Sequence, residues 1–192
     1  MRILVHLCCA SCSTYSLRAL REEGHDLLGL FFNPNIHPFS EYLLRKASME
    51  DYSQRVGLRI VWPAGEEMES FFQAVAFHEE QRCHICYKMR LSRAAEAAKR
   101  EGCDAFTTTL LISPYQKHDL LRQIGSEVEE ASGIPFYYVD FRPGWRWSRQ
   151  EARQLGLYRQ NYCGCLYSEK ERQLERLGKK GCPLASTPSA SS

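Results

Sequence analysis

The stretch ILVHLCCASCS, residues 3–13, indicates which class of fold this chain adopts. Its first part, residues 3–7, is a short apolar run typical of a strand buried on both faces. The residues that follow place Cys8, Cys9 and Cys12 in the turn that opens the first expected helix, where many α/β folds carry a glycine-rich phosphate loop. A buried strand followed by a thiol-bearing turn predicts an α/β protein with a ligand site at the end of its first strand.

The rest of the chain alternates short apolar runs with helical patterns, which is typical of a parallel sheet covered by helices on both faces. The further expected strands are 27–32, 58–62, 105–111 and 136–141. The expected helices are 13–23, 39–56, 66–77, 84–101 and 115–132, with two short ones near 148–155 and 167–178. We therefore expect a Rossmann-like, doubly wound α/β sheet with a short helical C-terminal extension, and a ligand site beyond the carboxyl ends of its strands.

The length of 192 residues fits one domain. We place this catalytic domain at residues 1–180, ahead of a polar tail, 181–192, that we expect to be disordered. Its C-terminal part, residues 141–180, is basic, with ten Lys and Arg against four Glu, a net charge of +6. Residues 1–140 hold fifteen Lys and Arg against nineteen acidic residues, a net charge of −4. A basic segment with interleaved aromatic residues is compatible with binding a nucleic-acid backbone, and equally with a solvated helical surface.

The apolar segments give no sign of a membrane or secreted protein. None approaches the length of a membrane span, and the apolar start of the chain is too short for a signal peptide. We therefore expect a cytoplasmic protein without a membrane partner. Nine cysteines are then a high and odd number, because structural disulfides are rare in a reducing compartment. Clustered cysteines in that compartment indicate metal binding or redox chemistry.

Two pairs of cysteines offer ligands for one metal centre. Cys83 and Cys86 form a C-x-x-C pair at the start of a helix, where one turn brings both sulfur atoms to the same side. Cys8 and Cys9 are adjacent, a spacing that suits ligation better than an unstrained disulfide. Together the pairs supply four thiolates, the complement of a [4Fe-4S] cluster or of a closed zinc site. Cys12, one helical turn past Cys8, faces either the same site or the core.

A third pair, Cys163 and Cys165, is separated by Gly164 alone. The pair could be a disulfide staple, a metal site or a redox couple that cycles, and a reducing compartment argues against the staple. A C-x-C disulfide closes a small strained ring, so it should be reduced more readily than a structural bridge. Tyr115 and Gln116 follow the fourth expected strand and could face the same ligand site.

Four motifs together resemble one protein family, the cobalamin-independent epoxyqueuosine reductases (QueH). The motifs are CCASCS (8–13), CHICYKMR (83–90), TTTLLISPYQKHDLLRQIG (107–125) and LYRQNYCGCLYS (157–168). They follow the order and spacing of the family from about residue 2 to about residue 172. Ser11 departs from the family pattern, which has proline at this place, and the change should alter the stiffness of the loop rather than ligation.

The resemblance implies the last step of queuosine synthesis, a two-electron reduction of the epoxide of epoxyqueuosine at the wobble position of tRNA, with release of water. It implies an iron–sulfur protein without cobalamin, with which an additional iron has been associated, and a fold related to PP-loop adenine nucleotide α-hydrolase domains. Cys163 and Cys165 are then the catalytic pair, either as a redox disulfide, which we favour, or as ligands of a second metal. Cys12 is the candidate ligand for additional iron. The implied ligands of the [4Fe-4S] cluster are Cys8, Cys9, Cys83 and Cys86.

A tRNA substrate would give the basic segment a role. An anticodon loop presents phosphates and unstacked bases, which Arg and aromatic side chains recognise together. The reaction also needs an electron donor, which the sequence does not identify. The candidate tRNA-binding residues are Arg142, Arg146, Arg149, Arg153, Arg159, Tyr115 and Gln116.

Other functions remain in competition with the reductase. A PP-loop tRNA sulfur-transferase would need a Ser-Gly-Gly-x-Asp-Ser loop for ATP after the first strand, where this chain has CCASCS, so the sequence predicts no ATP site. A zinc-stabilised RNA-binding module without catalysis would use the same cysteines. A thioredoxin-like oxidoreductase is disfavoured, because the C-x-x-C pair does not follow the first strand of a short βαβ unit.

Overall fold

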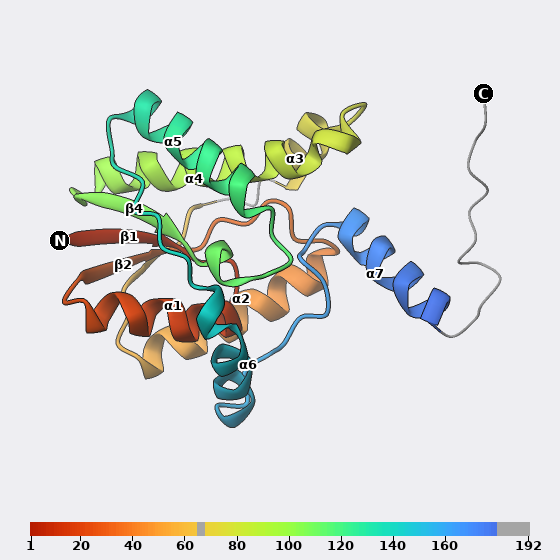
Figure 1. The fold of residues 1–192 in the computed structure, drawn as a ribbon, viewed down its shortest axis with the longest axis horizontal. Coiled ribbons are helices and arrows are strands. Elements are labelled where there is room, and N and C mark those ends of the chain that lie inside the picture. The colour runs from red at the N-terminus through yellow and green to blue at the C-terminus, as the bar shows by residue number, and fades with distance from the viewer. Residues whose placement is uncertain (65–67, 180–192) are drawn as a thin grey trace.

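Four parallel strands form the sheet of the computed structural model, which describes residues 1–64 and 68–179 (Figure 1). The strands are β1 (Arg2–His6), β2 (Asp26–Leu30), β3 (Ile60–Val61) and β4 (Ala105–Thr108), in the order β3-β2-β1-β4. Along β1, Arg2 lies opposite Asp26 of β2, and Ile3 lies opposite Ala105 of β4. The predicted fold class, a parallel α/β sheet in a Rossmann-like order, is confirmed.

Helices cover both faces of this sheet (Figure 1). The pair α1 and α2 lies on one face, and α4 and α5 lie on the other; α6 packs against α1, and α7 extends beyond the sheet. None of the helices in the described part of the chain combines the length and apolarity that a bilayer crossing requires. The helices are α1 (Ala10–Glu22), α2 (Phe39–Arg55), α3 (Met68–Val75), α4 (Arg82–Arg100), α5 (His118–Ser132), α6 (Trp145–Gln154) and α7 (Leu166–Lys179).

The core follows from the periodicity of the sequence. Strand β1 is apolar at successive positions such as Leu4 and Val5, and both are fully buried because helices cover both faces of the sheet. Helix α5 instead buries one stripe, Leu121, Ile124 and Val128, at the three- and four-residue spacing of a helix face. The sheet and the stripes that pack on it form a rigid base for the loops at its edge.

Helix ends differ from the predicted ones where local contacts decide them. Helix α1 begins at Ala10 rather than at residue 13, because the Cys9 side chain caps it by accepting a hydrogen bond from the Cys12 amide. Helix α3 ends at Val75 rather than at 77, since Phe77 has a φ of 64°, which no right-handed helix contains. Residues 66 and 67 of that predicted helix, and the predicted tail 181–192, lie outside the described residues.

The last two predicted strands are shorter than expected. Strand β4 ends at Thr108, whose hydroxyl accepts a hydrogen bond from the Leu110 amide and turns the chain into a 3-10 helix, Thr109–Ile112. The predicted strand 136–141 is reduced to a single parallel bridge between Phe136 and Phe106, because the backbone that it would pair with leaves the sheet after Thr108. The open edge is therefore shaped by turns rather than by a fifth strand.

The strand order places the ends of β1 and β4 at the point where the sheet reverses its winding. Ligands of doubly wound sheets bind in the crevice outside this point. The residues that enter the crevice are those just past β1, beginning with Leu7 and Cys8, and those just past β4, beginning with Thr109. The CCASCS turn therefore faces the expected ligand site.

Candidate functional site

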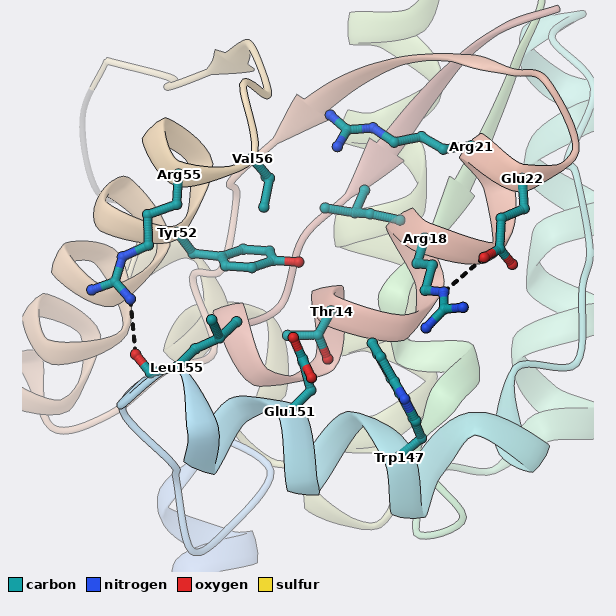
Figure 2. Close-up of a pocket in the computed structure, with 11 residues that line it drawn as sticks. Thr14, Arg18, Arg21, Glu22, Tyr52, Arg55, Val56, Trp147, Glu151 and Leu155 are labelled. Carbon is teal, nitrogen blue, oxygen red and sulfur yellow. Dashed lines mark hydrogen bonds and ion pairs between the residues drawn. The ribbon is translucent and has the colours of Figure 1, made fainter.

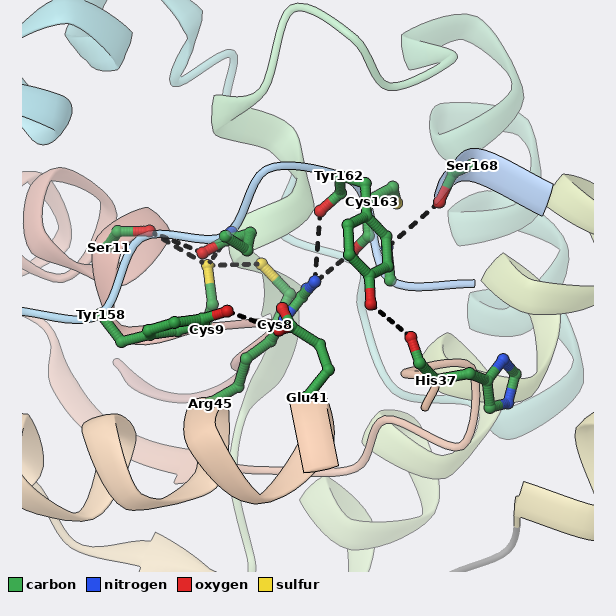
Figure 3. Close-up of polar contacts among 12 residues, drawn as sticks. Cys8, Cys9, Ser11, His37, Glu41, Arg45, Tyr158, Tyr162, Cys163 and Ser168 are labelled. Atoms are coloured by element: carbon green, nitrogen blue, oxygen red, sulfur yellow. Dashed lines mark hydrogen bonds and ion pairs between the residues drawn. The ribbon is translucent and has the colours of Figure 1, made fainter. Parts of the chain in front are cut away.

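Three buried thiols form a compact group past the end of β1. The sulfur atoms of Cys8, Cys9 and Cys12 all lie within 4.8 Å of one another, and we call these residues the thiol triad. Helix geometry explains the grouping: Cys9 is the N-cap of α1, and Cys12 lies in the first turn above it. Figure 3 shows Cys8 and Cys9 beside Ser11 and the buried Arg45. Three thiols at this spacing can ligate one metal ion together.

Neighbouring polar groups contact the sulfur atoms of the triad. The Gln160 amide donates to Cys9 Sγ at 2.8 Å, and the Thr109 hydroxyl donates to Cys8 Sγ at 3.2 Å. Burial raises the pKa of Cys9, but hydrogen bonds with Cys12 and Cys8 and the positive charge of Arg45 outweigh it and hold this pKa well below its usual value. Hydrogen bonds with Cys8 and Cys9 raise the pKa of Cys12. Cys9 is thus the triad member best prepared to be a thiolate.

A second group joins the C-x-x-C and C-x-C pairs. Cys83 and Cys86 lie in the first two turns of α4, and Cys86 is buried in a small apolar cluster against which Cys165 also packs. The pKa of Cys86 is raised to about 12, chiefly by burial; the positive charge of Arg90 opposes this shift, and the charges of Cys163 and Cys165 add to it. Burial also raises the pKa of Cys83, on which Cys163 and Cys165 act in the same direction. These four thiols therefore lie within electrostatic reach of one another.

The segment Tyr162–Cys165, which we call the strap, is fixed to helix α2 and to the loop before it. Arg45 donates to the Cys163 carbonyl at 2.7 Å and to the Tyr162 carbonyl at 3.2 Å (Figure 3). The His37 amide donates to the Gly164 carbonyl at 2.8 Å. A Cβ atom at Gly164 would lie 2.8 Å from Asn35 Nδ2, so this close approach requires glycine. The strap holds the exposed thiol of Cys163 at one place.

Gln116 contacts a thiol, and Tyr115 precedes it in the turn after β4. The Gln116 amide donates to Cys163 Sγ at 3.2 Å, while its oxygen accepts a hydrogen bond from Tyr87 at 2.7 Å. Tyr115 is 82% exposed and contacts Trp145 edge-on. Gln116 therefore holds a thiol, and Tyr115 offers an open aromatic ring.

A cleft of about 460 Å³ connects these features. Cys8 and Cys12 line its floor together with Cys163 of the strap, and polar groups such as Gln160 and Asn161 complete it. The remaining lining residues come from the turn after β4, from α6 and from α7, and include Tyr115, Gln116, Trp145, Arg149, Glu171 and Arg172. A polar ligand in this cleft would meet thiols of both groups.

The predicted basic residues occupy different places. Arg149 stacks over Trp145 at 5.4 Å and lines the cleft, and with Arg146 and Arg153 it also lines a groove of about 490 Å³ on α6. Arg142 forms a bidentate pair with Asp140. Arg159 is exposed and does not line the cleft among the described residues. Three of the five arginines therefore share one surface.

A further cavity of about 480 Å³ lies on the other side of α6, between α1 and α2 (Figure 2). Arg18, Arg21 and Arg55 line it together with Tyr52 and Trp147. Arg18 pairs with Glu22 at 2.7 Å, and Arg55 donates to the Leu155 carbonyl at 2.8 Å. None of the cysteines in the described ranges lines this cavity, so it is separate from the thiol site.

Sequence reasoning missed three residues of the site. Arg45 and Arg90 are both 1% exposed, although single arginines in helical patterns usually indicate surface positions. Arg90 stands four residues after Cys86 in CHICYKMR, a spacing that puts both on one helix face and could have revealed it. Gln160 lies within LYRQNYCGCLYS, but a neutral glutamine has no charge that would mark it as a site residue in the sequence. His6 is buried inside β1, where Thr108 and Phe32 satisfy both of its ring nitrogens.

The donor set of the thiol triad fits a metal ion. Thiols are soft ligands, and in the described part of the chain the triad alone brings three of them within 4.8 Å of one another. Three segments contribute thiols to this region, and we call the seven together the thiol centre: Cys8, Cys9, Cys12, Cys83, Cys86, Cys163 and Cys165. Beside them, Arg90 Nη2 is buried without a hydrogen-bond partner among the described residues. A buried cationic nitrogen in this position suits a centre that carries negative charge.

The comparisons with known proteins agree with the motifs. A family model described as epoxyqueuosine reductase QueH matches residues 3–171. A protein of this name from Dehalococcoides mccartyi is 37% identical over 182 residues, covering 95% of this chain and 98% of that relative. Another of the same name from Thermotoga maritima is 33% identical over 180 residues, covering 89% and 92%.

A solved structure extends the likeness to the fold. The predicted subunit of a tRNA methyltransferase from Methanocaldococcus jannaschii superimposes with a TM-score of 0.54 at 14% identity, over 100% of this chain and 94% of that one. At this identity the likeness concerns the fold alone. The family model and the two relatives confirm the resemblance found in the motifs. The chain therefore belongs to the epoxyqueuosine reductase QueH family of oxidoreductases.

Proposed function

We propose that this chain reduces the epoxide of epoxyqueuosine in tRNA to the alkene of queuosine. The observation that carries the proposal is a cleft lined by thiols of two segments, Cys8 and Cys12 of the triad and Cys163 of the strap, with Cys86 near enough for the charge of Cys163 to act on it. The reaction consumes two electrons and two protons, breaks both C–O bonds of the epoxide, and releases the oxygen as water. Thiols and the metals that they bind are the groups in proteins best suited to supply such electrons.

We assign Cys8, Cys9, Cys83 and Cys86 to a [4Fe-4S] cluster and Cys12 to an additional iron. The buried triad and the unpartnered Arg90 nitrogen support an anionic centre at this place. A bound cluster would relay the electrons of the reaction one at a time, and the additional iron would offer an open position as a Lewis acid for the epoxide oxygen. The chain's own contribution is to bury the ligands and to donate hydrogen bonds to their sulfur atoms from Gln160 and Thr109.

Cys163 and Cys165 act as a redox pair in this proposal. Two thiols that become a disulfide release two electrons and two protons, the number that the epoxide requires. An external electron donor then reduces the disulfide and restores both S–H groups. Gln116 and Arg45 hold Cys163 in the cleft during this cycle, and Gly164 permits the tight backbone. The competing assignment makes the same two residues ligands of the second iron.

The tRNA would bind along α6 and the rim of the cleft. Trp145 and Tyr115 offer aromatic rings on which unstacked bases can stack, and Arg149 lines both the cleft and the groove on α6. The arginines of the basic segment would contact phosphates. We propose that residues 1–180 act as one catalytic domain in the cytoplasm, where cellular reductants keep the pair active. The full set of proposed tRNA contacts is Arg142, Arg146, Arg149, Arg153, Arg159, Tyr115 and Gln116.

An anaerobic assay tests the proposal directly. Purified protein, reconstituted with iron and sulfide, is incubated with epoxyqueuosine-containing tRNA and a chemical reductant, and queuosine is measured by mass spectrometry. We expect a brown protein that forms queuosine. A colourless protein that holds zinc and forms no queuosine would instead establish a zinc-stabilised RNA-binding module.

Single cysteine variants separate the assigned roles. Cys8→Ala, Cys9→Ala, Cys83→Ala and Cys86→Ala should each lower iron and sulfide content. Cys163→Ser should keep the cluster and lose turnover, and its thiol in the parent protein should resist alkylation after one turnover without reductant. Full alkylation in every state, together with iron loss in Cys163→Ser, would favour the ligand assignment. Cys103→Ser is the matched control, because Cys103 is buried just before the amino end of β4, whereas the site lies beyond the carboxyl ends of the strands.

A further inference from the structure

Arg90 is a buried cation whose hydrogen bonding is incomplete. Its side chain is 1% exposed, on the face of α4 that packs against the sheet. Nε donates to the Cys86 carbonyl at 3.2 Å, and the guanidinium lies 5.8 Å from the centre of the Tyr87 ring. Nη2 is buried and has no acceptor among residues 1–64 and 68–179. A buried charged donor left without a partner is costly, so its presence needs an explanation.

Arg45, the other fully buried arginine, shows what complete pairing looks like in this protein. It forms an ion pair with Glu41 at 2.8 Å and donates to the carbonyl groups of Tyr162 and Cys163. The strongest electrostatic partners of Arg90 are three thiols, Cys86, Cys163 and Cys8, rather than a carboxylate. A thiol is neutral until it loses its proton, so only the deprotonated centre can balance Arg90.

The three partners of Arg90 come from all three thiol-bearing segments. Cys8 belongs to the triad, Cys86 to the C-x-x-C pair, and Cys163 to the strap. Thiols that bind a metal do so as thiolates, and each ligand adds a negative charge to the centre. A single cation placed among the three segments therefore interacts with the whole centre rather than with one ligand.

We propose that Arg90 is the residue that balances the charge of the loaded thiol centre, a positioning and tuning role that rests on the proposed metal-binding function. In the metal-free protein the positive charge of Arg90 is uncompensated and destabilises the folded state. In the loaded protein the thiolates accept its unpartnered N–H group and its charge. Arg90 thus lowers the stability of the empty protein and raises the affinity for metal.

This role predicts opposite changes in two measurements on one variant. Arg90→Met removes the charge from a buried site while keeping an unbranched apolar stem. The metal-free variant should unfold at the same or a higher denaturant concentration than the parent protein, because burial of an unpaired charge is unfavourable. The reconstituted variant should lose iron to a chelator about 10-fold faster or more, as is typical when a partner of metal ligands is removed.

The midpoint potential gives a third measurement that a purely structural residue would not change. Loss of a positive charge beside the centre makes addition of an electron less favourable, so the potential of Arg90→Met should move to a more negative value. Arg90→Lys keeps the charge and should lie between the parent protein and Arg90→Met in both iron retention and potential. Arg100→Met is the matched control, since it removes the same charge from an exposed position on the same helix and should behave as the parent protein.

Two results would overturn the proposal. One is iron retention and potential in Arg90→Met equal to those of the parent protein. The other is a metal-free Arg90→Met that unfolds more easily, with iron retention falling only in proportion to that loss, which would make Arg90 a structural support. Should the parent protein hold zinc in place of iron and sulfide, the reductase proposal fails. The chelator experiment with zinc then still decides the role of Arg90.

Discussion

Variants of the buried pair Glu41–Arg45 should distinguish two effects of this pair, one on the stability of the protein and one on the placement of the strap. Arg45→Met removes the guanidinium that lies 2.8 Å from Glu41 and leaves this carboxylate in a site that is 7% exposed. Breaking a buried ion pair from one side costs about 3–5 kcal/mol of unfolding free energy. In the double variant Glu41→Leu/Arg45→Met no charge is left unpaired. The double variant then lacks the two hydrogen bonds from Arg45 to the strap carbonyls and the one from the Tyr158 hydroxyl to Glu41, at a net cost of about 2–3 kcal/mol.

The double variant should therefore regain about 1–2 kcal/mol over the single variant, measured by urea unfolding of the metal-free protein. Its turnover of epoxyqueuosine in tRNA should stay low by about 100-fold, because displacement of a reacting group by about 1 Å has an effect of this size. The exposed pair Asp51–Arg55 on the same helix is the control, where the same changes should cost about 0–1 kcal/mol. A double variant as unstable as Arg45→Met, or one with parental turnover, would refute the reasoning.

Three further predictions concern separate parts of the molecule. Arg149→Ala combined with Arg153→Ala should weaken tRNA binding and reduce the slope of its salt dependence by about 0.7 for each phosphate of the single-stranded loop that is no longer neutralised. An unchanged slope would show that both residues are ordinary surface charges. Gln160→Leu removes the 2.8 Å donor to Cys9 Sγ, so redox titration should give a more negative midpoint potential, and parental values would exclude this hydrogen bond as a tuning interaction. Burial raises the pKa of Tyr52 from 10.0 to about 12, so its contribution to stability is complete below pH 10 and is lost as the pH rises through 12. The unfolding free energy of the parent protein should fall faster than that of Tyr52→Phe over this window, by up to about 1.4 kcal/mol per pH unit, and parallel curves would contradict it.

The sequence was sufficient to predict the layers of the fold and the location of the site. Buried parallel strands carry few polar residues on either face, and residues 3–7 (ILVHL) and 105–108 (AFTT) contain none of the charged residues Asp, Glu, Lys and Arg. Once these strands are placed side by side, the CCASCS turn and the residues after β4 must lie at one edge of the sheet. Helix starts were less predictable, because a cysteine cap at Cys9 is not among the usual capping residues.

The internal grouping of the thiols depends on tertiary contacts that no local pattern contains. The predicted ligand set pairs Cys83 and Cys86 with the first loop, whereas the charges of Cys163 and Cys165 act on both in the structure. The path of the strap decides this arrangement, and the strap is held by Arg45 from a helix more than a hundred residues away. Long-range hydrogen bonds of this kind leave no periodic signal in the sequence.

The capping role of Cys9 makes the first turn of α1 a reporter of chemistry at the thiols. Its sulfur accepts a hydrogen bond from the Cys12 amide at 3.4 Å. A thiolate accepts such a bond more strongly than a neutral thiol does. Proton exchange of the Cys12 amide with solvent should consequently slow when Cys9 is ionised or ligated. The amide resonance of Cys12, followed by NMR, would thus show whether the thiol centre is empty or filled.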